Sequence, residues 1–137
     1  MTKGQPFSVR LDEATEQLVE AEARRTRRSK SAVVEGLTEE AARARRFAGI
    51  AFRGDDAGRR AWVIGSGLDV WEIAQMLDES GSPDALAKDS ELSAGQIRLA
   101  MAYRLAYPAE IDALIEENRR PLTDVKVLFP FIEVVEA

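Results

Sequence analysis

The sequence contains no cysteine and no histidine among its 137 residues. Without cysteine, it shows no sign of a disulfide framework, a thiolate metal site or a cysteine nucleophile. Without histidine, it lacks the commonest general base of enzymes and the commonest protein ligand of transition metals. The composition therefore predicts a chain without a metal site.

Long apolar runs are also missing. No stretch approaches the ~20 apolar residues that a membrane-spanning helix needs. The first residues, up to Gln5, do not have the pattern of a signal peptide, and the apolar residues that follow alternate with polar ones. We expect a cytoplasmic protein with no membrane partner.

The acidic and glycine-rich clusters do not suggest a catalytic site. Asp55-Asp56, Asp78-Glu79 and Glu116-Glu117 are adjacent pairs, and neighbours on a helix do not face each other. Gly65-Ser66-Gly67 lacks the lysine and the spacing of a phosphate-binding loop. We expect that the chain is not an enzyme and that it needs no cofactor.

The charges are unevenly distributed, although the net charge of the chain is -5. Residues 1–49 hold 10 Lys and Arg against 8 Asp and Glu, a net of +2, whereas residues 50–120 hold 8 against 13, a net of -5. Residues 121–137 add a net of -2. The pattern indicates a weakly basic module joined to an acidic one, and ordinary variation in composition is the competing explanation.

A short strand is predicted near the beginning of the chain. Phe7, Val9 and Leu11 alternate with Ser8 and Arg10, so the apolar and polar residues lie on opposite faces. A single strand leaves its backbone groups unpaired. The simplest partner is the same strand of a second copy, with Ser8 and Arg10 of each copy on the outer face of the two-stranded ribbon. The major groove of B-DNA admits a ribbon of that width.

Two helices are predicted after this strand. Asp12 is the expected N-cap of the first helix, which ends near Arg25, and Ser29 caps the second, which ends by Gly49. The expected apolar faces are rich in alanine: Ala14, Leu18 and Ala21 in the first helix, and Val34, Leu37, Ala41, Ala44 and Ala48 in the second. Each helix alone would bury little, which favours two copies packed around a shared core.

One strand followed by two helices resembles the ribbon-helix-helix family of dimeric DNA-binding proteins. The residues that carry the resemblance are Ser8-Val9-Arg10-Leu11-Asp12 and Ser29-Lys30-Ser31-Ala32-Val33. The resemblance implies that residues 1–49 dimerise and bind DNA, with alternate strand residues touching bases.

Six residues are the candidate DNA contacts: Lys3, Ser8, Arg10, Ser29, Lys30 and Ser31. Arg10 has the donors for guanine O6/N7 or a phosphate, and Ser8 can reach a base edge. Residues 29–31 lie at a helix N-terminus, where free N–H groups bind phosphate. The alternatives are solvent-facing strand residues and a plain N-cap beside a solvated lysine.

Residues 50–118 predict a hairpin followed by three or four helices. Short strands are expected at residues 50–53 and 60–64, with a turn at residues 54–58. Helices are expected from about Asp69, Ser82-Pro83, Ser93 and Ala109, the third with a Ser93–Gln96 capping box.

This arrangement resembles a small winged-helix-like domain of unknown function that is common in prokaryotic antitoxins encoded beside PIN-like ribonuclease toxins. The matching residues are Val70-Trp71-Glu72-Ile73, Gly81-Ser82-Pro83, Leu92-Ser93, Ile97-Arg98 and Ala102-Tyr103. Gly65-Ser66-Gly67-Leu68 stands where that family usually has Gly-Thr-Arg-Ile, so the family's arginine is missing. The exposed basic residues of the third helix are expected to be Arg98 and Arg104 alone, which favours a dimerisation or scaffold role over DNA reading. Trp62 and Trp71 are expected in the core.

Residues 119–137 form an extended tail with an apolar run near its end. Its candidate partner contacts are Val127, Leu128, Phe129, Phe131 and Ile132, because exposed apolar segments of this kind mark partner sites. In the alternative, the run folds back on the chain's own hairpin at Phe52 and Trp62.

The prediction is a mainly α protein with short β: a dimeric ribbon-helix-helix module (1–49), a winged-helix-like domain (50–118) and a tail (119–137). By resemblance it is the antitoxin of a type II toxin–antitoxin pair. Its expected partners are operator DNA, a PIN-like ribonuclease toxin and a second copy, as a homodimer or higher even oligomer. The alternative is a stand-alone ribbon-helix-helix repressor with a C-terminal assembly or effector domain.

Overall fold

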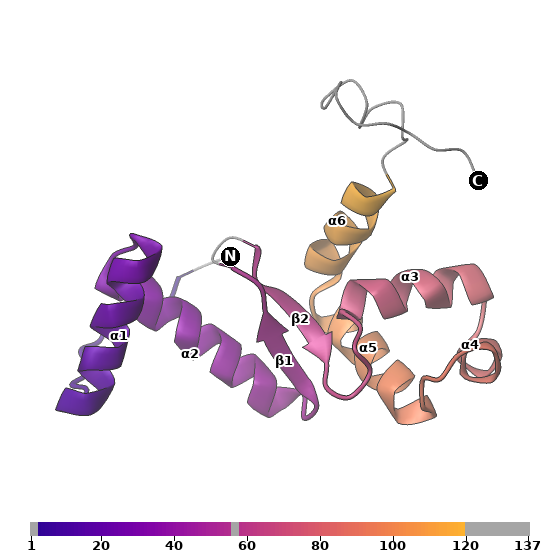
Figure 1. Ribbon diagram of the computed structural model, residues 1–137, viewed down its shortest axis with the longest axis horizontal. Helices are drawn as coiled ribbons and strands as arrows, with labels where there is room; N and C mark the ends of the chain where they lie inside the picture. The colour runs from indigo at the N-terminus through magenta and orange to yellow at the C-terminus, as the bar shows by residue number, and fades with distance from the viewer. Residues whose placement is uncertain (1–2, 56–57, 120–137) are drawn as a thin grey trace, which may run out of the picture. The chain divides into compact units, whose positions relative to one another are not determined.

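A computed structural model describes residues 3–55 and 58–119, which form six helices and a two-stranded sheet (Figure 1). The helices are α1 (Glu13–Thr26), α2 (Lys30–Arg46), α3 (Val70–Ser80), α4 (Pro83–Asp89), α5 (Ala94–Ala106) and α6 (Pro108–Asn118). The strands are β1 (Ile50–Arg53) and β2 (Arg60–Val63). A mainly helical fold with one short hairpin is therefore confirmed. The chain divides into two compact units, residues 1–45 (unit 1) and 46–137 (unit 2).

The ends of α1 and the start of α2 are set by local capping. The Asp12 carboxylate accepts a hydrogen bond from the Thr15 N–H at 2.7 Å, and this bond lowers the pKa of Asp12. Arg27, with a left-handed φ of 55°, ends α1. The Ser29 hydroxyl then accepts from the Ala32 N–H at 3.1 Å and begins α2. These caps confirm the predicted ends of α1 and the predicted start of α2, whereas α2 ends at Arg46, three residues before the predicted Gly49.

The predicted apolar face of α1 is wrong for the single chain. Ala14, Leu18 and Ala21 are exposed, whereas Val19 is buried. Leu18 and Val19 are consecutive and point about 100° apart around the helix axis, so helical spacing alone allows either face. Among the described residues of unit 1, only Val19 and Val33 are buried. Unit 1 therefore has a very small core of its own.

The predicted strand at residues 7–11 has no regular secondary structure in the single chain. Strand pairing needs a neighbouring strand, and the described sheet consists of β1 and β2 in unit 2. The intermolecular ribbon stays a prediction.

Unit 2 begins its core at the antiparallel hairpin. Ile50 pairs with Val63 and Phe52 with Ala61, which places four apolar residues on the face toward the core. Gly49 precedes β1 with φ 102°, and a side-chain carbon there would lie 2.8 Å from Leu99 Cδ2. Glycine therefore allows the chain to leave α2 and enter the hairpin.

Helices α3 to α6 follow the hairpin with clear capping. Capping boxes join Asp69 with Glu72 at α3 and Ser93 with Gln96 at α5, and Pro108 occupies the first turn of α6. Their buried side chains form one cluster with the hairpin: Val70, Ile73, Ala74, Leu86, Leu92, Ile97, Ala100, Tyr103, Ile111 and Ile115. No helix among the described residues is long and apolar enough to span a membrane.

Arg104 links three helices of unit 2 and is less exposed than the sequence predicted. Its guanidinium donates to Asp78 on α3 at 2.8 and 3.1 Å and to Asp112 on α6 at 3.0 Å. The Arg104 side chain is 28% exposed. Its hydrogen bonds lower the pKa of Asp78.

We expect Arg104→Gln to lower the free energy of unfolding at pH 7 by about 1 kcal/mol or less, because the Asp78 side chain is partly exposed. A lowered pKa stabilises the fold above the ordinary carboxyl value of about 3.9, and this stabilisation is lost as pH falls through the folded-state value. The variant should therefore lose less stability than the parent between pH 5 and 3 in thermal melts. Arg98→Gln, on the same helix and exposed, is the control; equal acid sensitivity of parent and Arg104→Gln would contradict the expectation.

Candidate nucleic-acid interface

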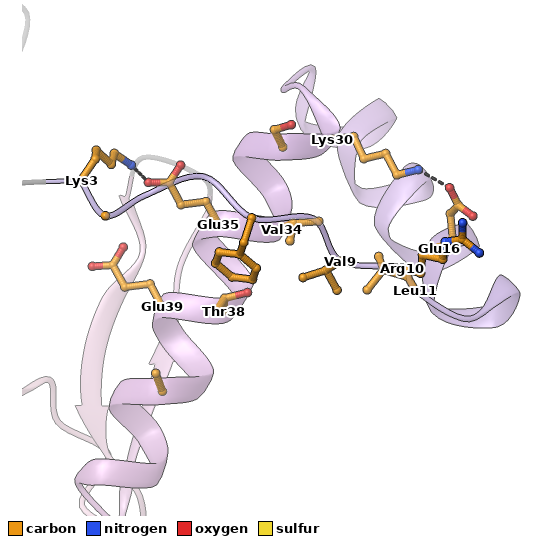
Figure 2. A pocket seen from close by; sticks show the side chains of 14 residues that line it. Lys3, Val9, Arg10, Leu11, Glu16, Lys30, Val34, Glu35, Thr38 and Glu39 are labelled. Carbon is orange, nitrogen blue, oxygen red and sulfur yellow. Dashed lines mark hydrogen bonds and ion pairs between the residues drawn. The ribbon is translucent and has the colours of Figure 1, made fainter.

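The N-terminal segment and α2 enclose an open cavity in unit 1. Residues 3–11 run alongside α2, and Lys3 forms an ion pair with Glu35 (Figure 2). The cavity has a volume of about 950 Å³ and is lined by Phe7, Val9 and Leu11 together with Val34 and further residues of α2. The lining therefore combines apolar side chains with charged ones from the segment, α1 and α2.

Large apolar side chains of unit 1 face solvent. Phe7 is 85% exposed and Val9 62%, and on the helices Leu18 and Leu37 are exposed as well. Of these, Phe7 and Val9 line the same cavity, and contiguous exposed apolar groups mark binding surfaces.

Lys3, Arg10, Lys30 and Ser31 all line this cavity, so the fold brings four of the predicted DNA contacts together. Arg10 is exposed, and among the described residues no hydrogen bond or ion pair holds its guanidinium. Ser8 is exposed and does not line the cavity. The six candidates are thus all in unit 1, but Lys3 lies at the far end of the segment, beside Glu35.

Lys30 is paired with carboxylates of α1. Its ammonium donates to Glu16, and Glu20 lies 3.7 Å away. The hydrogen bond to Glu16 is the main cause that raises the pKa of Lys30, and the negative charge of Glu20 adds to it. A phosphate at the start of α2 would compete with both carboxylates for this ammonium.

The acidic partners of the two lysines were not among the candidate site residues predicted from the sequence. Glu16 and Glu35 both line the cavity, yet they lie 14 and 32 positions from the lysines they pair with. No local pattern predicts such pairs, because they depend on how α1, α2 and the N-terminal segment meet. The predicted tail contacts, Val127, Leu128, Phe129, Phe131 and Ile132, lie outside the described residues.

Comparison with known proteins adds nothing to this geometry. No protein-family model matches the chain, and no match was found among curated proteins or among solved structures.

Proposed function

We propose that this chain is a dimeric DNA-binding protein of the ribbon-helix-helix type, and that it acts as the antitoxin of a type II toxin–antitoxin pair. One observation carries the DNA-binding half. The N-terminal segment leaves the apolar side chains of Phe7 and Val9 exposed, and its Arg10 lines the same cavity as Lys30 of α2.

A second copy of the segment would pair the backbone groups of residues 7–11 and cover their exposed apolar side chains. Pairing residues 7–11 of two copies supplies partners for the backbone N–H and C=O groups. In the pair, Phe7 and Val9, which line the cavity of each copy, would be covered by the partner copy and removed from water. The alternating pattern then directs Ser8 and Arg10 to the opposite face of the ribbon, toward a major groove.

The start of α2 suits a phosphate beside that groove. The free N–H groups of the first turn and the positive end of the helix dipole attract an anion. Lys30 and Ser31 stand at this turn and are exposed. Contacts to phosphate fix the position of the ribbon on the duplex, while Arg10 and Ser8 supply the sequence preference.

The toxin-binding half rests on the resemblance of residues 50–118 and on the composition of the tail. Unit 2 carries the acidic part of the chain, and helices α3 to α6 span residues 70–118 with 3 Lys and Arg against 10 Asp and Glu. An acidic surface of this kind repels the phosphate backbone of DNA and suits a protein partner. We place the nuclease contact in the tail, at residues 127–132, and autorepression of the operon in unit 1.

The full-length chain should be a dimer, and the double variant Phe7→Asp/Val9→Asp should be a monomer, because charges on this face oppose its burial. Multi-angle light scattering over a range of concentrations measures both. Ser8→Asp, on the opposite face of the same segment, should remain dimeric. A parent protein that is monomeric at all concentrations would overturn the ribbon.

Arg10→Ala should weaken binding to the chain's own promoter DNA by about 1–3 kcal/mol and relax the sequence preference. Lys30→Ala should weaken binding to all duplexes alike and reduce the salt slope by about one. Glu16→Gln/Glu20→Gln should act in the opposite direction, because it frees the Lys30 ammonium for phosphate. Fluorescence anisotropy across a salt series separates the three variants. Parent-like binding in all of them would move the DNA site elsewhere.

Deleting residues 121–137 should abolish neutralisation of the nuclease encoded beside this gene, while dimerisation, thermal stability and operator binding stay near those of the parent. Growth rescue on co-expression with that nuclease, paired with thermal melts, tests this. A stable truncated protein that still neutralises would place the toxin contact elsewhere. A stable full-length protein that binds its operator but neutralises no neighbouring product would favour the stand-alone repressor.

A further inference from the structure

The outer face of the hairpin in unit 2 carries two arginines directly opposite each other. Arg53 on β1 is the register partner of Arg60 on β2, and Trp62 lies two residues along on the same face. Like charges in a cross-strand pair destabilise a sheet. An interaction must therefore offset this repulsion, and it comes from Asp69.

Asp69 is 3% exposed and holds both arginines. Arg53 Nε donates to its Oδ1 at 2.8 Å, and Arg60 Nε lies 3.2 Å from its Oδ2. The indole N–H of Trp71 donates to the same Oδ2 at 3.2 Å, and Arg53 Nη2 donates to the Gly67 carbonyl at 3.1 Å. The carboxylate thus fixes both guanidinium groups in place.

The Arg53 guanidinium also stacks on an aromatic ring. Its central carbon lies 4.8 Å from the centre of the Trp62 ring. The Arg53 and Arg60 side chains are still 41% and 45% exposed. Both tryptophans are half-buried. Trp71 packs against the core cluster, whereas the expectation that Trp62 lies in the core is wrong. The chain has two tryptophans, and both contribute to this cluster.

Among the residues that the structure describes, Arg53 and Arg60 share Asp69 as their carboxylate partner. The nearby Glu72 carboxylate accepts from the backbone N–H of Asp69 at 3.0 Å. This face with two arginines belongs to a unit whose helices α3 to α6 are strongly acidic. A further anion placed against the exposed edges would give the two guanidinium groups a second charged partner.

We propose that Arg53, Arg60, Trp62, Asp69 and Trp71 form a binding site for single-stranded nucleic acid. Arg60 binds a backbone phosphate, and an unpaired base stacks on the outer plane of the Arg53 guanidinium, which Trp62 supports from below. Asp69 is the positioning residue that holds both guanidinium groups. This site is separate from the duplex-binding face proposed for unit 1 and does not depend on it.

The stacked plane favours nucleic acid over an acidic peptide. A peptide carboxylate would be bound by the two charges alone and would gain nothing from a flat, ring-supported guanidinium. A nucleotide uses both features, because it has a phosphate and a π-face within one residue.

Titration of the full-length protein with a short oligothymidine tests the proposal by intrinsic tryptophan fluorescence. Because both tryptophans belong to the cluster, quenching reports on this site. We expect saturable quenching, with a dissociation constant that rises about tenfold in Arg53→Gln and in Arg60→Gln. Each variant leaves Asp69 one cationic partner, and thermal melts identify any that fails to fold. Arg60→Lys, which keeps the charge, serves as the second variant and should bind between parent and Arg60→Gln.

The control for a general loss of positive charge is Arg98→Gln, an exposed arginine of α5, which should quench like the parent. Arg10→Ala/Lys30→Ala should also quench like the parent, which separates this site from the one in unit 1. Absence of quenching by oligothymidine would overturn the proposal. So would equal quenching by polyglutamate, which would indicate an acidic protein partner, or by inorganic phosphate at the same concentration, which would indicate simple anion binding.

Discussion

Unit 2 depends on a single buried charge. Asp69 is the one charged residue that is buried among the residues the structure describes. A carboxylate removed from water needs cationic or N–H partners, and it finds them in Arg53, Arg60 and Trp71. Asp69 also stands at the N-cap of α3 in a capping box with Glu72. The same side chain therefore starts a helix, joins that helix to both strands of the hairpin and orders the outer face of the sheet.

Unit 1 is built in the opposite way. It has two buried valines among its described residues, and its large apolar side chains remain at the surface. A helix pair with so little buried area gains little from its own packing. Unit 2, in contrast, has a contiguous core around Tyr103, which makes edge contacts with Phe47 and Phe52. The proposed dimer accounts for the small core of unit 1, because a second copy would complete that core.

Ion pairs of unit 1 bear on how a DNA-binding face would act. Lys3 is paired with Glu35, and Lys30 with Glu16 and Glu20, so neither lysine presents its full charge to a phosphate. If unit 1 binds DNA as proposed, these ion pairs would weaken its phosphate contacts, whereas Arg10 has no such partner among the described residues. Under the proposed function, this arrangement favours sequence discrimination over non-specific affinity.

The sequence by itself determined the features that arise from local interactions. Caps at Asp12, Ser29 and Ser93 could be predicted, because each depends on residues within a few positions. The burial of Val19 instead of Leu18, the binding of Arg104 by two helices and the gathering of both arginines and both tryptophans at Asp69 could not. These depend on contacts between residues far apart in the chain. The packing of α3 against the hairpin gathers the cluster at Asp69, the packing of α5 beside α3 and α6 sets the bonds of Arg104, and Val19 is buried within unit 1.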